Sequence, residues 1–135
     1  MPILDFRFNK INAVNNNKTI PKDGMKVDMK VNFTNVEELP KPENSPTSAL
    51  KADFEFNLDY SKNGNVNLLG SVVYGAENEK IKKIINSWKK DKQLEKEVST
   101  LIMNVILLRT NVKALTLSQD VNLPLHLRMP ALAKD

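Results

Sequence analysis

The 135-residue chain contains no cysteine, a single histidine and only four glycines. Without cysteine it has no disulfide bond, no thiolate zinc site and no thiol nucleophile. The lone His126 excludes a metal site built from several imidazoles, and the glycines form neither GxGxxG nor GxxxxGK[ST] phosphate loops. No catalytic residue, metal site or cofactor site is predicted, and the composition argues against an enzyme.

Charge of one sign and long apolar runs are also scarce. Lys and Arg number 20 against 16 Asp and Glu, and the lysines of residues 77–97 are interspersed with acids, which indicates a solvated helix face rather than a nucleic-acid interface. The run 101–108 is far shorter than the ~20 residues that span a bilayer. With the charged amino terminus, these features predict a cytoplasmic protein without membrane insertion and a single domain over residues 1–135.

Apolar and polar residues alternate in four segments of the first half, the pattern of strands with one buried face. These segments are 4–14, 25–33, 52–60 and 66–74. In the first segment the parity of the apolar residues switches after Phe8, which predicts a bulge near Asn9 and Lys10. Asn63-Gly64 favours a tight hairpin between the last two segments. A loop with three prolines is expected over 39–48.

The second half changes to helical spacing. Ile81, Ile84, Ile85 and Trp88 predict a first amphipathic helix over 77–91, and a second follows from 92 to about 117. The centre of the second helix is apolar nearly all round, and a four-stranded sheet covers only one of its faces. A partner subunit is therefore expected to cover the other face. The predicted interface residues are Leu101, Ile102, Val105, Ile106 and Leu108.

Together these elements predict an α+β fold. A four-stranded antiparallel sheet carries a long amphipathic helix, preceded by a shorter helix, on one face. Residues 121–130 alternate between two prolines and predict an extended segment. Met25, Met29, Met103 and Met129 fall on the apolar segments. Each fits ordinary core filling, but together they suit a surface that binds varied apolar partners.

The order of elements resembles the SecB export chaperones over nearly the whole chain. The stretch 6–11 is similar to the first strand of that family, 25–29 repeats its apolar-Lys-apolar-Asp-apolar second strand, and 123–127 resembles its leucine-and-proline segment after the long helix. The resemblance implies a homotetramer, built as a dimer of dimers with the long helices in the middle. It also implies ATP-independent binding of unfolded polypeptides.

By position, the resemblance implies a polypeptide-binding groove. Three residues of the second strand would line it, Met25, Val27 and Met29, with three tail residues nearby, Leu125, Leu127 and Met129. SecB proteins offer acidic residues near the end of the first strand to the motor SecA. Here residues 15–19 read Asn-Asn-Asn-Lys-Thr, so SecA is not expected as a partner. SecB-like proteins also chaperone antitoxins, a narrower role that would fit.

Three functions therefore remain open for the sequence. The first is an ATP-independent holdase for unfolded or nascent polypeptides, acting in protein export or dedicated to an antitoxin. The second is an oligomeric scaffold with the same fold and one folded partner. The third, a basic nucleic-acid-binding module, is the weakest, because a net charge of +4 is small.

Overall fold

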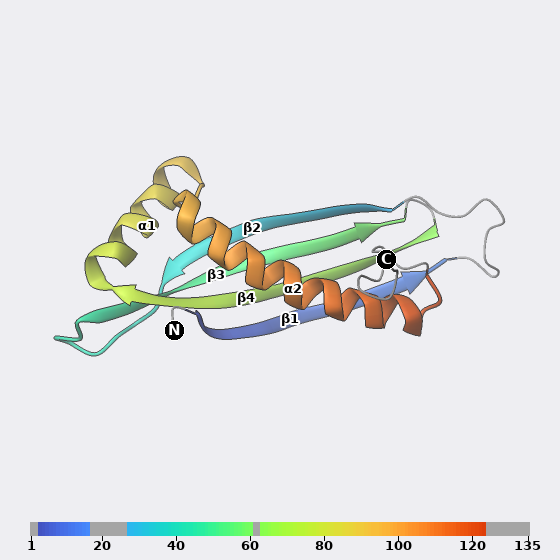
Figure 1. Cartoon of the computed structure of the whole chain (residues 1–135), viewed down its shortest axis with the longest axis horizontal. Coiled ribbons are helices and arrows are strands. Elements are labelled where there is room, and N and C mark those ends of the chain that lie inside the picture. The colour runs from blue at the N-terminus through green and yellow to red at the C-terminus, as the bar shows by residue number, and fades with distance from the viewer. Residues whose placement is uncertain (1–2, 17–26, 61–62, 124–135) are drawn as a thin grey trace, which may run out of the picture.

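A computed structural model of the chain describes residues 3–16, 27–60 and 63–123. Within these residues four strands precede two helices along the chain (Figure 1). The elements are β1 (Ile3–Asn15), β2 (Asp28–Glu38), β3 (Thr47–Asp59), β4 (Gly64–Glu77), α1 (Asn78–Asp91) and α2 (Lys96–Asp120).

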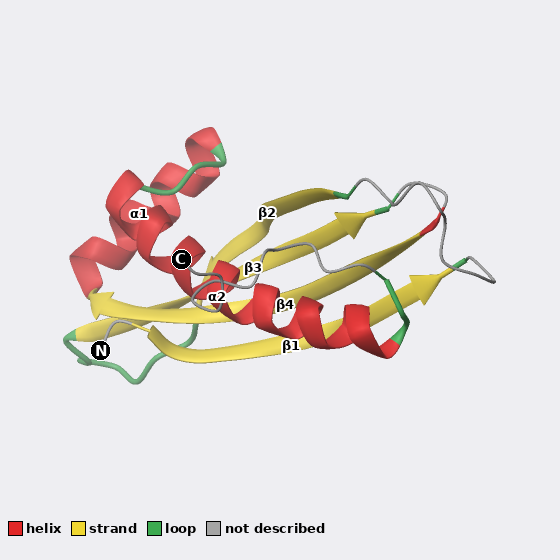
Figure 2. Ribbon diagram, turned by 45° about the vertical axis from the view of Figure 1, so that its right-hand side comes forward, coloured by secondary structure: helices red, strands yellow, loops and turns green. Residues whose placement is uncertain are grey.

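The strands form one sheet in the order β1-β4-β3-β2, and all neighbouring pairs are antiparallel. β1 and β2 are therefore the two edge strands. Both helices lie on the same face of the sheet (Figure 2). The predicted fold is confirmed: a four-stranded antiparallel sheet with a short and a long helix on one face.

The predicted bulge in β1 is present. The register between β1 and β4 shifts between Phe8 and Lys10, so Asn9 is the extra residue. Even-numbered residues Phe6 and Phe8 face the helices before the shift, and odd-numbered Ile11 does so after it, opposite Leu68. The bulge thus keeps Phe6 and Phe8 before it, and Ile11 and Ala13 after it, on the helix side.

The other strands extend beyond their predicted bounds. β2 continues to Glu38 because a second bulge, between Phe33 and Asn35, changes the parity and places Val36 on the buried side. A search for unbroken alternation stops at Phe33 for that reason. β3 already begins at Thr47, so the proline-bearing loop is shorter than the predicted 39–48. The predicted strand residues 25 and 26 lie outside the described part of the chain.

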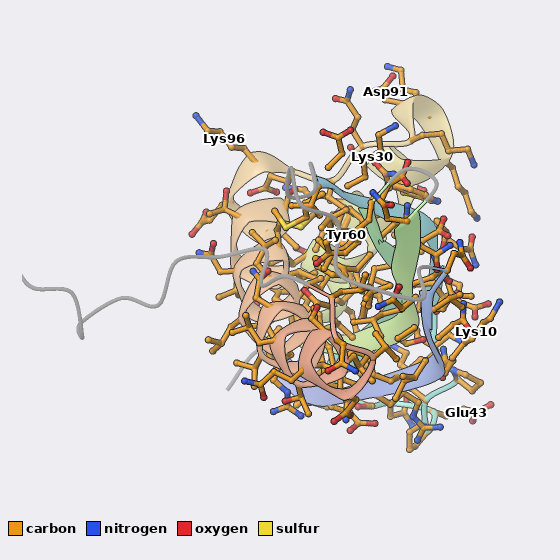
Figure 3. The ribbon with its side chains drawn as sticks, turned by 90° about the vertical axis from the view of Figure 1, so that its right-hand side faces the viewer. Lys10, Lys30, Glu43, Tyr60, Asp91 and Lys96 are labelled. Atoms are coloured by element: carbon orange, nitrogen blue, oxygen red, sulfur yellow. The ribbon has the colours of Figure 1, made fainter. Side chains whose placement is uncertain are left out.

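The central strands β3 and β4 carry the core. Even-numbered side chains of β3 from Ser48 to Leu58 are buried under the helices, and so is Tyr60 just after the strand, whereas odd-numbered side chains of β3 face the open side. α1 buries Ile81, Ile84, Ile85 and Trp88, as its spacing predicts. Figure 3 shows α2 along one side of the sheet, Lys10 projecting from the opposite side and Tyr60 in the interior.

A residue with a left-handed backbone follows each helix. Lys92 has φ 55° after α1, and Asn122 has φ 60° after α2, where the Leu123 amide donates to the Ser118 carbonyl. Residues 121–123 therefore cap α2 rather than beginning an extended segment. Asparagine tolerates this conformation and forms such caps. This local preference of Asn122 outweighs the alternation of apolar and polar residues from which the extended segment is predicted. The rest of the predicted extended segment lies outside the described residues.

Gly70 is required where β4 passes beneath an aromatic ring. A Cβ there would lie 2.4 Å from the Arg7 carbonyl oxygen and 2.5 Å from the ring of Phe54. We expect Gly70→Ala to lower the free energy of unfolding by about 1–3 kcal/mol through overpacking. Urea denaturation measures this.

The matched control for that substitution is Gly75→Ala. Its Cβ would come closest to the Leu4 side chain, at 2.8 Å, and Leu4 is exposed and able to move. Equal destabilisation by the two substitutions would contradict the packing described around Phe54.

Candidate functional site

Large apolar side chains that are not buried in the core lie on three elements of the described chain. The large exposed ones are Leu4, Ile11 and Val14 on β1, Met29 on β2, and Leu101, Leu108 and Val112 on α2. β1 and β2 are edge strands, whose outer backbone groups have no ladder partner in the described sheet. The candidate surfaces therefore lie at the two edges of the sheet and on the outer side of α2.

The β2 edge holds the sequence-predicted binding residues that the structure describes. Met29 is 46% exposed and lies opposite Leu58, and Val27 is half-buried against the core cluster of Leu58 and Phe56. We define the β2 strip as Val27, Met29, Val31 and Phe33. An extended polypeptide can pair with such an edge and place alternate side chains on its apolar face. Met25, Leu125, Leu127 and Met129 lie outside the described residues.

Every fourth residue of α2 is buried, and these residues form a line along the helix. Four residues exceed one helical turn by about 40°, so the line of buried residues winds around the helix. α2 crosses the twisted sheet obliquely, and its second half lies over β4 and β1 (Figure 1). A pattern that looks apolar all round can thus arise from one winding contact. The buried residues are Val98, Ile102, Ile106, Thr110, Ala114 and Ser118.

This geometry corrects part of the predicted oligomer interface. Ile102 and Ile106 are completely buried against the chain's own sheet, so they belong to the core of the protomer and are not available to a partner. Leu101 and Leu108 are exposed, at 37% and 67%, and Val105 is half-buried. Val112, 58% exposed, extends this outer surface although the sequence analysis did not single it out.

A groove of about 360 Å³ lies between α2 and β1. Its apolar residues are Phe8, Leu108 and Val112, and Arg109, Lys113 and Thr116 complete it. The Arg109 guanidinium carbon lies 4.9 Å from the ring centre of Phe6, and the Lys113 ammonium lies 6.0 Å from that of Phe8. Sequence reasoning missed this groove. The sequence pattern that could have revealed it is a pair of cations four residues apart on a helix together with two phenylalanines two residues apart on a strand.

A larger cleft of about 850 Å³ lies where β4 ends and both helices begin. Tyr74, Val98 and Leu101 supply apolar surface, while Lys80 and Glu97 make the lining mixed. The Tyr74 side chain raises the pKa of Lys80, mainly by hydrogen bonding, and Glu97 adds to the shift. The ammonium therefore stays charged at neutral pH, and the cleft is not a purely apolar groove.

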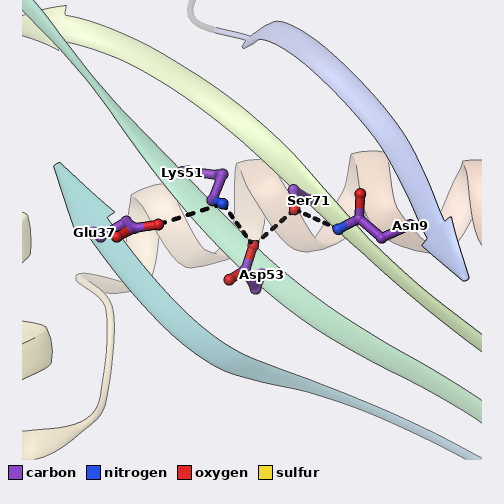
Figure 4. A network of polar contacts seen from close by, with 5 residues as sticks. All are labelled: Asn9, Glu37, Lys51, Asp53 and Ser71. Atoms are coloured by element: carbon purple, nitrogen blue, oxygen red, sulfur yellow. Dashed lines mark hydrogen bonds and ion pairs between the residues drawn. The ribbon is translucent and has the colours of Figure 1, made fainter. Parts of the chain in front are cut away.

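The open face of the sheet is polar. Across all four strands the Asn9 amide donates to the Ser71 hydroxyl at 3.0 Å, and that hydroxyl donates to Asp53 at 2.7 Å. Lys51 lies 3.9 Å from Asp53 and 3.3 Å from Glu37 (Figure 4). This network leaves the open face poorly suited to binding apolar segments.

The described residues contain no group of three acidic, histidine or cysteine side chains that could hold a metal ion. Asp53 and Glu55, two carboxylates on the open face of β3, accept hydrogen bonds from Ser71 and Asn67. His126 lies outside the described part of the chain. The chemistry that these surfaces offer is apolar and electrostatic contact.

α2 is long and apolar enough to cross a membrane, by length and composition alone, and 28% of its most apolar window is buried in the protomer. The core helix of a soluble protein satisfies the same criterion. Its winding buried line packs on the sheet, and Arg109 and Lys113 lie in its second half. These contacts favour α2 as a helix that packs on the sheet over a helix that crosses a membrane.

The fold has a counterpart among solved structures. The chain is similar to a SecB-like chaperone of Mycobacterium tuberculosis in complex with a ChAD peptide from the antitoxin HigA1, with a TM-score of 0.54 and 12% sequence identity over 98% of this chain and 91% of the other. No protein-family model and no curated protein matches the sequence. The chain therefore has a SecB-like fold, as the resemblance in the sequence implied.

The two sides of α2 differ in their expected effect on stability. Ile102→Ala and Ile106→Ala should each lower the free energy of unfolding by about 2–5 kcal/mol, because they leave cavities in the core. Leu108→Ser and Val112→Ser should change it by less than about 0.5 kcal/mol in the isolated protomer. Urea denaturation at low protein concentration measures both. A large loss for Leu108→Ser alone would contradict its outward position.

Proposed function

We propose that the protein is an ATP-independent chaperone that holds unfolded or nascent polypeptides on the apolar surface at the edge of its sheet. The observation that carries this is the β2 strip, with Met29 46% exposed on an edge strand of a SecB-like sheet. A partner segment gains backbone hydrogen bonds from the edge and buries apolar side chains on the strip. Many weak contacts of this kind keep clients from aggregating without nucleotide chemistry.

The binding residues of this proposal are those that the sequence resemblance implied. Val27 and Met29 contribute through the strip. Met25 and the tail residues Leu125, Leu127 and Met129 extend it in the proposal. Methionine suits the role because its unbranched, polarizable side chain adapts to differently shaped partners.

A chaperone dedicated to one partner is the second candidate. The favouring observation is that the structural neighbour is a SecB-like chaperone bound to an antitoxin peptide. A single client would require the same strip but a narrower sequence preference. A role in protein export rests on the sequence resemblance alone, and SecA is not included as a partner. The proposed cytoplasmic location rests on the composition.

The proposal includes a homotetramer, a dimer of dimers assembled through the outer side of α2. Leu108 and Val112 are large apolar side chains that solvent does not favour, and Leu101 and Val105 continue the same helix. A symmetric contact between two copies of α2 would bury this surface.

Client holding is tested by light scattering. A guanidinium-denatured, aggregation-prone protein is diluted into buffer with equimolar chain and no ATP, and we expect scattering to be suppressed. Val27→Ser/Met29→Ser should raise the concentration for half-suppression by about five-fold or more, because it removes apolar contact area.

The matched control changes the other face of the same strand. Lys30→Ser/Asn32→Ser keeps the β2 edge but alters side chains on the open face, and it should behave as the unmodified chain. Absence of suppression across several clients would overturn the chaperone proposal, and equal loss in both variants would remove the β2 strip from it.

Assembly is tested by size exclusion with multi-angle light scattering. We expect a mass four times the 15.3 kDa of one chain. Leu108→Glu/Val112→Glu should reduce it, because two buried carboxylates would oppose association. Leu4→Glu, which alters another exposed leucine on β1, is the control. A monomer for the unmodified chain would refute the assembly.

A further inference from the structure

β2 is an edge strand whose two sides differ in chemistry. The side chains of the β2 strip face the helix side of the sheet, and Met29 among them is 46% exposed. The residues between them are exposed on the open face. They are Asp28, Lys30 and Asn32. A polypeptide that pairs with this edge becomes a fifth strand and continues both faces. It therefore needs apolar side chains on one side and polar side chains on the other.

This edge lies apart from the helix surface that the proposed tetramer buries. β2 and β1 are the opposite edges of the sheet (Figure 1). On the outer side of α2, Leu108 and Val112 lie beside Phe8 of β1, and Leu101 lies beside the end of β4. The β2 edge is therefore accessible to a client in the proposed assembly.

The regular part of the β2 edge is short. The register between β2 and β3 is unbroken from Asp28 to Phe33, and it shifts before Asn35. A bulge of this kind bends the strand and interrupts its edge. With Val27 included, the regular edge corresponds to about 23 Å of extended chain. A segment that pairs with residues 27–33 has side chains over the strip at alternate positions and side chains on the open face between them.

Two charged side chains on the open side of β2 have no opposite charge directly across the ladder. Asp28 lies opposite Asp59, another carboxylate, and Lys30 lies opposite Asn57. The ion pairs found among the described residues include neither Asp28 nor Lys30. Opposite charges that face each other on neighbouring strands attract. A fifth strand therefore gains from a basic residue opposite Asp28 and from an acidic residue opposite Lys30.

We propose that the β2 edge binds client segments in which apolar and polar residues alternate over the length of residues 27–33. Such a segment pairs antiparallel with β2, as all neighbouring strands of this sheet do. Its apolar side chains cover the β2 strip. In chain order its polar residues are neutral, acidic and basic, opposite Asn32, Lys30 and Asp28. The inference rests on the proposed chaperone function and names its substrate class.

Two fluorescein-labelled peptides of identical composition test the pattern. Each joins four valines, a serine, a glutamate and a lysine to a soluble linker, and each is used at a concentration at which it is monomeric. Valine alternates with the polar residues in the first peptide and precedes all of them in the second. Fluorescence anisotropy should show the alternating peptide binding at least about ten-fold more tightly, because the second can place only half of its valines on the strip.

The order of the two charges is tested by exchanging glutamate and lysine in the alternating peptide. This should weaken binding by about two- to ten-fold, since like charges then face each other. The variant Asp28→Lys/Lys30→Asp should invert that preference and keep the preference for alternation. The control Asp5→Arg/Arg7→Asp makes the corresponding exchange at exposed positions on the open side of β1, and it should bind as the unmodified chain does. Circular dichroism melts confirm that each variant is folded.

Backbone methylation distinguishes strand pairing from contact with the strip alone. In a paired strand alternate amides point towards β2, and the remaining amides point away from it. Two derivatives of the alternating peptide each carry N-methyl groups on one of these two sets. One derivative should lose at least about ten-fold in affinity and the other less than about three-fold. Equal affinities of the two derivatives would overturn the fifth-strand arrangement.

The outcomes separate this inference from the chaperone proposal. If the two patterns bind equally, or neither binds, while clients are still held, the substrate class is overturned and the chaperone function stands. An inverted charge preference in the β1 control would move the segment to the other edge and overturn the assignment to β2. No effect of exchanging the charges would overturn their proposed order. If no peptide binds and no client is held, the chaperone proposal itself fails.

Discussion

The packing of α2 across the sheet is the contact on which the rest of the molecule depends. The helix buries every fourth residue from Val98 to Ser118, and this line winds around it because four residues exceed one turn. In the first half the line consists of large side chains, Ile102 and Ile106, which close the core over β3 and β4. In the second half it consists of the smaller residues Thr110, Ala114 and Ser118.

The course of this buried line determines which side of α2 remains available. On the other side of α2, Leu101, Leu108 and Val112 are exposed. Arg109 and Lys113 fall on the flank over Phe6 and Phe8. β2, at the far edge of the sheet, keeps its own apolar strip. The polar network across the open face, from Asn9 to Glu37, leaves apolar contact to the helix side and the edges.

Much of the fold could be read from local periodicity. Alternation located the strands, the parity switch located the bulge at Asn9, and the spacing of Ile81 to Trp88 gave α1 with its buried face. The second bulge was missed because Val36 alone marks the new parity in β2. Ile102 and Ile106 were misassigned to the interface because the buried position shifts around α2 from one turn to the next. On a helical wheel, apolar residues therefore appear on every side of the helix. The groove was missed because it joins residues some hundred positions apart, which periodicity cannot bring together.

The account's central claim is that apolar segments of other polypeptides bind the edges and the helix side of a SecB-like sheet. Hydrogen–deuterium exchange of the chain, with and without an unfolded client, tests this most directly. The account predicts new protection at the outer amides of β2 around Met29 and at β1 beside α2. It predicts unchanged exchange in the central strands β3 and β4. No new protection at either edge, with client bound, would contradict it.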